Sequence, residues 1–247
     1  AAATACYGLG GEGFACLRVG EDAFQVMALE GLTVTMTSPR LGKAIVALAC
    51  VDEWTYAVVS SRELLCFERG KLRSRFALDV DVELLTPVGS TLVGAGAKSV
   101  SVWTDPRRRG NFFTFPVSSS SRVTAIAHPP TYLNKILVGY GSGLSSSPDE
   151  APRGGSKDSS SEAKVVLELW NVRSKKLVHR FFRGVHKKAG VSALEPSGVA
   201  DVVAVGYDDG AIELLDARKD QVLFALEDGF GGHKRRVTAL AFARGGA

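Results

Sequence analysis

Basic side chains are the groups whose types and spacing most readily suggest binding chemistry in this sequence. They gather in short runs: Arg107-Arg108-Arg109, Lys175-Lys176, His186-Lys187-Lys188 and His233-Lys234-Arg235-Arg236. Each phosphate that such a run neutralises releases counterions, which gives a salt-dependent affinity for nucleic acid. An acidic protein would meet the same charges, and a solvated surface needs no ligand at all. Aromatic residues do not alternate with these runs, so stacking on bases is not indicated.

Two glycine-rich stretches resemble catalytic or cofactor motifs only in part. GLGGEG at 8–13 has the spacing of a dinucleotide-binding loop. That loop must open a helix, whereas the strand-like FACLRV follows here. GYGSG at 139–143 places its serine wrongly for a nucleophile elbow. We expect neither a cofactor nor a small-molecule substrate.

Histidines and carboxylates also fail to form a catalytic pattern. The four histidines are His128, His179, His186 and His233. None has a second metal ligand at a typical spacing. Asp208 and Asp209 are adjacent in a predicted turn, so they do not face each other as an acid–base pair. An enzyme would need a convergent polar cluster, and we expect no catalytic or metal site.

Composition indicates a globular chain. Of its 247 residues 45% are hydrophobic and 23% are charged, with a net charge of +4, which allows a sizeable core. No apolar stretch approaches the roughly 20 residues of a membrane span, and the first residues do not resemble a secretory signal. The four cysteines contain no CxxC spacing and lie in apolar runs, which favours reduced core thiols and a reducing compartment.

A short apolar motif recurs along the chain and predicts the elements that must position the polar groups. It reads IVALA, VELLT, VTAIA, VSALE and VTALA, starting at 45, 82, 123, 191 and 237. The one long gap contains the Ser/Gly/Pro-rich stretch 142–163, which cannot repay its ordering entropy by burial and is expected to be a disordered insertion. Without these 22 residues the period is about 40 to 46.

Each period contains four strand-like segments. VSALE is followed by DVVAVGYDDG at 201–210, AIELLDA at 211–217 and QVLFALE at 221–227. Asp209-Gly210 is a two-residue hairpin signal, and no segment has a helical period over three turns. Four short strands in about 40 to 46 residues predict a blade of a β-propeller. A β-sandwich is the rival fold, against which the periodicity argues.

We therefore predict an all-β, partial β-propeller over residues 1–247. The expected blades are 14–37, 44–77, 82–117, 122–182 and 190–227, with a sixth beginning at Val237. Residues 3–9 are expected to be the outer strand of a closing blade. Because a lone first strand would expose an unpaired edge, we expect the chain to be part of a longer polypeptide with a ring of about seven blades.

The stretch HPPTY, residues 128–132, precedes a buried-looking strand. Pro129 and Pro130 remove two N–H donors, so this preface cannot join a sheet ladder. Tyr132 and Leu133 are then expected to fold over the blade edge. Two interpretations stay open: a packing corner, or a partner contact formed by His128, Pro129, Pro130, Thr131 and Tyr132.

Three segments carry a resemblance to a known family. LELWNVRSKKLVHRF at 167–181 resembles the third-to-fourth strand passage of a WD-repeat blade, with Asn171 where an Asp often stands. Together with AHPPTYLNKILVGYGSG at 127–143 and DVVAVGYDDGAIELLDAR at 201–218, it resembles the U3 small nucleolar RNA-associated WD-repeat subunit of the UtpB complex. The similarity covers roughly 14–242 and is strongest in 122–218.

The resemblance implies a function as well as a fold. Members carry two tandem propellers and a helical C-terminal region, of which this chain would supply most of the first propeller. It implies a non-catalytic, nucleolar scaffold of the small-subunit processome that supports pre-rRNA processing and assembly of the small ribosomal subunit. The implied partners are other WD-repeat subunits of the UtpB complex, U3 small nucleolar RNA and pre-rRNA, with no membrane. The alternative is a generic WD-repeat adaptor of another cytosolic assembly.

The candidate site residues follow from these readings. The corner residues 128–132 are candidates for a protein partner. The candidates for RNA phosphates or an acidic partner are Arg107, Arg108, Arg109, Lys187, Lys188, Lys234, Arg235 and Arg236.

Overall fold

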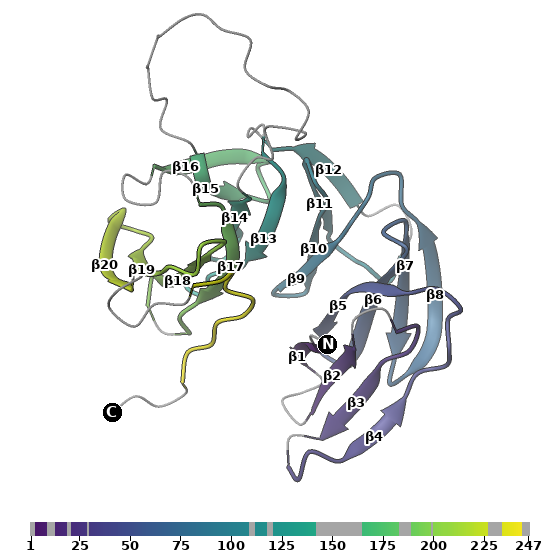
Figure 1. Cartoon of the computed structure of the whole chain (residues 1–247). Coiled ribbons are helices and arrows are strands. Elements are labelled where there is room, and N and C mark those ends of the chain that lie inside the picture. The colour runs from purple at the N-terminus through teal and green to yellow at the C-terminus, as the bar shows by residue number, and fades with distance from the viewer. Residues whose placement is uncertain are drawn as a thin grey trace, which may run out of the picture. The chain divides into compact units, whose positions relative to one another are not determined.

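The structure of the chain is a computed structural model (Figure 1). It describes residues 3–8, 13–18, 21–28, 30–108, 112–117, 121–141, 165–182, 189–198, 200–226 and 234–243. The chain divides into two compact units, Ala1–Val117 and Ser118–Ala247. The predicted insertion 142–163 lies outside the described residues.

The first unit contains three four-stranded sheets in its described part. Sheet 1 consists of β1 (Ala3–Gly8), β2 (Gly13–Arg18), β3 (Gln25–Ala28) and β4 (Val34–Thr37). Sheet 2 consists of β5 (Ile45–Val51), β6 (Trp54–Val59), β7 (Glu63–Glu68) and β8 (Lys71–Ala77). Sheet 3 consists of β9 (Leu84–Val88), β10 (Thr91–Ala95), β11 (Ser99–Trp103) and β12 (Phe112–Pro116).

The second unit contains two more such sheets in its described part. Sheet 4 consists of β13 (Val123–Ala127), β14 (Lys135–Tyr140), β15 (Val165–Asn171) and β16 (Lys176–Phe182). Sheet 5 consists of β17 (Val191–Pro196), β18 (Val202–Tyr207), β19 (Ile212–Asp216) and β20 (Gln221–Leu226).

All five sheets are antiparallel meanders in which neighbouring strands follow one another along the chain. Within the first unit, the first strands β1, β5 and β9 pack in succession, and within the second unit β13 packs against β17. No helix occurs among the described residues. This arrangement is that of propeller blades and confirms the predicted all-β fold class of a WD-repeat β-propeller.

The hydrophobic core lies between successive sheets. In the second unit one cluster combines Leu137 and Phe181 of sheet 4 with Val191, Val205 and Leu215 of sheet 5. Two clusters of the first unit likewise join sheet 1 to sheet 2 and sheet 2 to sheet 3. The second strands β6, β10, β14 and β18 are buried almost throughout, whereas the fourth strands β8 and β20 are largely exposed. Within each unit, successive sheets therefore bury their facing surfaces against each other, as the apolar runs predict.

Sheet 1 corrects one sequence prediction. Residues 3–9 were expected in a separate closing blade, with the first blade starting at 14. Instead β1 pairs with β2 in one sheet, from Ala3 opposite Arg18 to Gly8 opposite Gly13. A hairpin between strands so close in sequence costs less loop-closure entropy than pairing with a distant strand. The GLGGEG stretch thus joins two strands, and no helix follows it.

The Asp209-Gly210 turn is also longer than the predicted two-residue hairpin. Tyr207 N donates to the carbonyl of Ala211, so three residues form the loop. Gly210 has a φ of +96°, and the Asp209 carboxylate accepts the amide of Ala211. A loop with its last residue in this conformation is the common three-residue hairpin, which needs glycine there.

Sheets 4 and 5 repeat a hydrogen-bonded tyrosine–glutamate pair in their interiors. The Tyr140 hydroxyl donates to Glu168, and the Tyr207 hydroxyl donates to Glu213 at 2.6 Å. Both glutamates are buried. Glu168 also accepts the indole N–H of Trp170 at 2.8 Å and pairs with Arg180 at 3.1 Å. Buried carboxylates need such partners, so the pairs fix the positions of the second and third strands.

The segment after sheet 5 docks where a following first strand would lie. Val237 is 5% exposed, its N–H donates to the carbonyl of Tyr207, and its carbonyl accepts the Ser192 hydroxyl at 2.7 Å. Residues 234–243 form no regular strand. A sixth blade beginning at Val237 therefore stays a prediction.

Candidate functional site

The HPPTY corner forms a tight turn between β13 and β14. The Tyr132 N–H donates to the carbonyl of Pro129, and His128 Nδ1 lies 2.9 Å from the carbonyl oxygen of Lys135. Pro129 is buried and Pro130 and Thr131 are exposed. Tyr132 packs against the core between sheets 4 and 5, as predicted. Leu133 does not fold over the edge, because it is 90% exposed.

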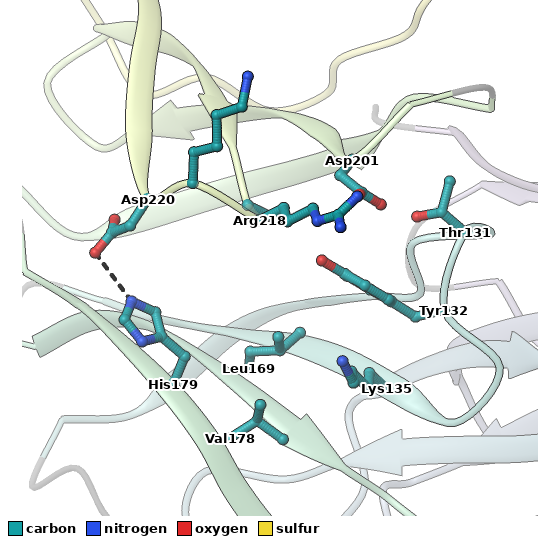
Figure 2. A pocket seen from close by; sticks show the side chains of 11 residues that line it. Thr131, Tyr132, Lys135, Leu169, Val178, His179, Asp201, Arg218 and Asp220 are labelled. Atoms are coloured by element: carbon teal, nitrogen blue, oxygen red, sulfur yellow. Dashed lines mark hydrogen bonds and ion pairs between the residues drawn. The ribbon is translucent and has the colours of Figure 1, made fainter.

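Thr131 and Tyr132 line a groove of about 700 Å³ between sheets 4 and 5, here called the Tyr132 groove (Figure 2). Its wall on sheet 4 consists of Thr131, Tyr132, Lys135, Leu169, Val178 and His179. Its wall on sheet 5 consists of Asp201, Ala217, Arg218, Lys219 and Asp220. Two predicted partner-contact residues thus meet side chains from distant parts of the sequence.

Tyr132 is held by a cation and by burial. The Lys135 ammonium lies 4.3 Å from the centre of its ring, within cation–π range. Burial raises the pKa of the Tyr132 hydroxyl, as does Asp201, while Arg218 opposes the shift. The hydroxyl is therefore protonated at neutral pH and can donate a hydrogen bond into the groove.

A β-bulge shapes the wall that β16 contributes. Leu169 pairs with His179 and Trp170 pairs with Leu177, so Val178 is an extra residue in β16. A bulge redirects neighbouring side chains, and Val178 and His179 both line the groove. His179 Nε2 lies 2.9 Å from Asp220 Oδ2, and its ring packs edge-on against Phe181.

The β19–β20 turn contributes the opposite wall and has an equivalent in sheet 4. Asp216 Oδ1 accepts the backbone N–H groups of Arg218 and Lys219. Asn171 Oδ1 accepts those of Arg173 and Ser174 in the same way. The backbone hydrogen bonds from Lys219 and Arg218 hold the pKa of Asp216 below its usual value. This side-chain cap fixes the turn, so Arg218 stands on a rigid base.

The first basic run is partly neutralised. Arg107 Nε lies 2.8 Å from Asp105 Oδ1, and Arg108 Nε lies 3.6 Å from Asp105 Oδ2. The Arg107 hydrogen bond lowers the pKa of Asp105, so this carboxylate stays ionised. Both arginines are exposed, and Arg109 lies outside the described residues.

The last basic run is less compensated. Lys234, Arg235 and Arg236 are exposed and line a shallow hollow of about 480 Å³ that continues to Ala239. Arg236 Nε lies 3.5 Å from Asp208 Oδ1. Lys187 and Lys188 lie outside the described residues, so their expected place on the same face stays a prediction.

In the part of the chain that the structure describes, no group of three or more His, Cys, Asp or Glu side chains is arranged to hold a metal ion. Over the same residues no helix is long and apolar enough to cross a lipid bilayer. Cys50 and Cys66 are buried thiols, as predicted for core cysteines.

Comparison with known proteins supplies two relatives. The chain is 26% identical over 219 residues to the U3 small nucleolar RNA-associated protein 21 homolog of Schizosaccharomyces pombe, covering 83% of this chain and 21% of that protein. It is 30% identical over 125 residues to human WD repeat-containing protein 36, covering 51% of this chain and 11% of that protein. By fold and likeness, the chain is of WD-repeat type. No protein-family model matches it.

The alignments cover only a small part of each relative's length, which limits what can be inferred about this chain. It spans about a fifth of the length of the first relative and about a tenth of the second. The blades described above therefore correspond to one part of a much larger protein in each case.

Sequence reasoning missed most of the Tyr132 groove. The corner was found because two prolines before an apolar strand are unusual. Arg218 has a weaker signal: it stands two residues after Asp216, as Arg173 stands two after Asn171. Val178 has no signal in the sequence, because a bulge residue in a strand does not visibly change the hydrophobic pattern.

Proposed function

We propose that this chain is a non-catalytic scaffold module of the small-subunit processome, acting in U3-dependent pre-rRNA processing and assembly of the small ribosomal subunit. The observation that carries the proposal is the likeness to a U3 small nucleolar RNA-associated protein over 83% of the chain. The fold suits the role, because blades that bury their faces against each other present turns and loops on a rigid frame.

Two surfaces are proposed for contact. The corner 128–132 would meet a sibling WD-repeat subunit of the UtpB complex. The exposed basic side chains would meet phosphates of U3 RNA or pre-rRNA, with Lys234 and Arg235 as the main candidates, since neither forms an ion pair with another described residue. Arg107 and Arg108 would contribute less because Asp105 already pairs with them.

The scaffold proposal is tested by purifying the tagged full-length protein from cells and sequencing its bound RNA. We expect U3 RNA and pre-rRNA to be enriched, UtpB subunits to be found by mass spectrometry, and nucleolar fluorescence. A cytosolic distribution without U3 RNA would instead favour the alternative, an adaptor of another assembly.

The RNA contact has its own test. The double variant Lys234→Gln/Arg235→Gln should bind RNA more weakly and reduce the dependence of log affinity on log salt by about 1.4 for single-stranded RNA, roughly 0.7 per lost phosphate contact. The matched control is Arg69→Gln/Arg73→Gln, because these arginines are paired with Glu53 and Glu68. Equal effects of the two double variants would contradict a specific role for 234–235.

A further inference from the structure

The Tyr132 groove has an apolar floor that is open to a ligand. Leu169 and Ala217 are buried, whereas Val178 is 47% exposed although it is aliphatic. Figure 2 shows Val178 and Leu169 between two polar ends, with Tyr132 and Arg218 at one end and His179 and Asp220 at the other. An aliphatic side chain of a ligand would cover Val178 and gain free energy from burial.

Cationic groups gather at the Tyr132 end. Lys135 lies over the Tyr132 ring, and the Arg218 side chain extends toward Tyr132 and Asp201 (Figure 2). Among the described residues neither Lys135 nor Arg218 forms an ion pair, and the Tyr132 hydroxyl has no hydrogen-bond partner. Three donors of a kind that binds carboxylate therefore face one space.

Two of the carboxylates in or near the groove have partners away from its Tyr132 end. Asp220 pairs with His179 at 2.9 Å, and Asp216, outside the groove, pairs with Lys219 at 3.5 Å. Asp201 is the remaining acidic side chain of the lining. The groove thus has one end with two cations, Lys135 and Arg218, beside Asp201, an aliphatic middle, and the His179–Asp220 hydrogen bond at its far end.

We propose that the Tyr132 groove binds an extended segment of a partner protein in which an Asp or Glu lies next to an aliphatic residue. The ligand carboxylate is held by Arg218, Lys135 and the Tyr132 hydroxyl, and the aliphatic side chain covers Val178. This inference rests on the proposed scaffold function, because it specifies the chemistry of a segment that the corner 128–132 receives.

The same geometry argues against nucleic acid in this groove. Tyr132 is the only six-membered aromatic ring of the described lining, and the Lys135 ammonium already occupies a place over it. The aliphatic floor suits a side chain better than a base. Phosphate contacts are better served by the exposed run 234–236.

The test uses fluorescence anisotropy with the full chain and two labelled peptides. The probe is Val-Asp-Val-Asp-Val, and its neutral counterpart is Val-Asn-Val-Asn-Val. We expect the aspartate peptide to bind about tenfold more tightly, a difference typical of one charge-assisted contact. Equal affinities, or no binding of the aspartate peptide, would overturn the proposal.

Variants separate the groove from general charge. Arg218→Gln should weaken the aspartate peptide about tenfold and leave the asparagine peptide unchanged. Arg173→Gln is the matched control, because Arg173 occupies the equivalent turn position and does not line the groove. Equal losses in both variants would overturn the proposal.

Reversing the charge of the groove distinguishes a lost contact from a misfolded variant, because a misfolded protein would not gain a new ligand. The double variant Lys135→Glu/Arg218→Glu should reject the aspartate peptide and bind Val-Lys-Val-Lys-Val instead. A labelled oligouridylate of matched length is the nucleic-acid arm. Binding of this oligonucleotide that Arg218→Gln abolishes, with no binding of the aspartate peptide, would assign the groove to RNA and overturn the proposal.

Failure here and failure of the scaffold proposal are distinguishable. If the chain co-purifies with U3 RNA but does not bind the aspartate peptide, only the groove inference is wrong. If the peptide binds as predicted but U3 RNA is absent from the purified protein, the processome assignment is wrong.

Discussion

The hydroxyl of Thr124 in β13 donates to the backbone carbonyl of Val191 in β17, at 2.5 Å, and so links two successive sheets. Ser192 repeats the contact toward Val237 at 2.7 Å. Both hydroxyls stand on the extra residue of a β-bulge, where each also lies within hydrogen-bond distance of a carbonyl of its own sheet, Gly139 at 3.3 Å and Gly206 at 3.2 Å. The bulge recurs in sheet 2, where Val46 occupies the position without a hydroxyl.

Thr124→Val tests this link between sheets. The substitution keeps the shape, and Val46 shows that the bulge accepts valine. We therefore expect only the hydroxyl's contacts with the Val191 and Gly139 carbonyls to be lost, lowering the free energy of unfolding by about 1 kcal/mol. Urea denaturation would measure it, with Thr35→Val as the control, because the Thr35 hydroxyl bonds within its own sheet on an exposed face. A change no larger than the control's would mean that the link contributes nothing.

Gly139 and Gly206 are predicted to be irreplaceable by larger residues. A Cβ at Gly139 would lie 2.6 Å from Cγ1 of Val191, and one at Gly206 would lie 2.6 Å from Cγ1 of Val237. Alanine at either position should cost roughly 1–3 kcal/mol, and valine more, because a packed interior must move to admit it. Gly198→Ala, where a Cβ meets nothing within 4 Å, is the control. Thermal unfolding of the three variants decides the matter.

These glycines also show how far sequence reasoning reached. The repeated VGY motif placed Gly139 and Gly206 in equivalent positions, and in the structure each faces a valine of the following segment, Val191 and Val237. The repeat of apolar residues along the chain predicts such equivalent positions, because strands packed between sheets bury both faces. The hydroxyl links could not be predicted, since Thr124 and Ser192 look like ordinary strand residues and their role depends on a bulge.

The Tyr132 groove was only half accessible to prediction for a related reason. Two prolines indicated the corner, but Lys135 and Arg218 line one groove only because sheets 4 and 5 pack against each other. β1 was misplaced because sequence shows that a strand exists, not which neighbour it pairs with. Leu133 was misplaced because an apolar residue type does not guarantee burial in a turn.

Cys66 gives the protein a predicted loss of stability at alkaline pH. Burial raises the pKa of its thiol from 9.0 to about 11, so the folded state keeps a proton that the unfolded state releases. The contribution of the protonated thiol to the free energy of unfolding is fully present below about pH 9. It falls by roughly 1.4 kcal/mol per pH unit between about pH 9 and 11. Buried tyrosines add to the fall, so the measurement is the difference in pH dependence between the parent chain and Cys66→Ala. A parallel dependence in both proteins would contradict the assignment.

The pair of Tyr140 and Glu168 is predicted to be energetically coupled. Tyr140→Phe removes a hydroxyl that donates to a fully buried carboxylate, which should cost about 1–3 kcal/mol. Glu168→Gln removes the charge that Trp170 and Arg180 also contact, so its cost should be larger. In the double variant the two losses should overlap, giving a coupling of about 0.5–3 kcal/mol in a double-mutant cycle from urea denaturation. Tyr132→Phe is the control, because the Tyr132 hydroxyl forms no hydrogen bond with a described residue. Strictly additive costs for Tyr140 and Glu168 would show that their contact does not stabilise the fold.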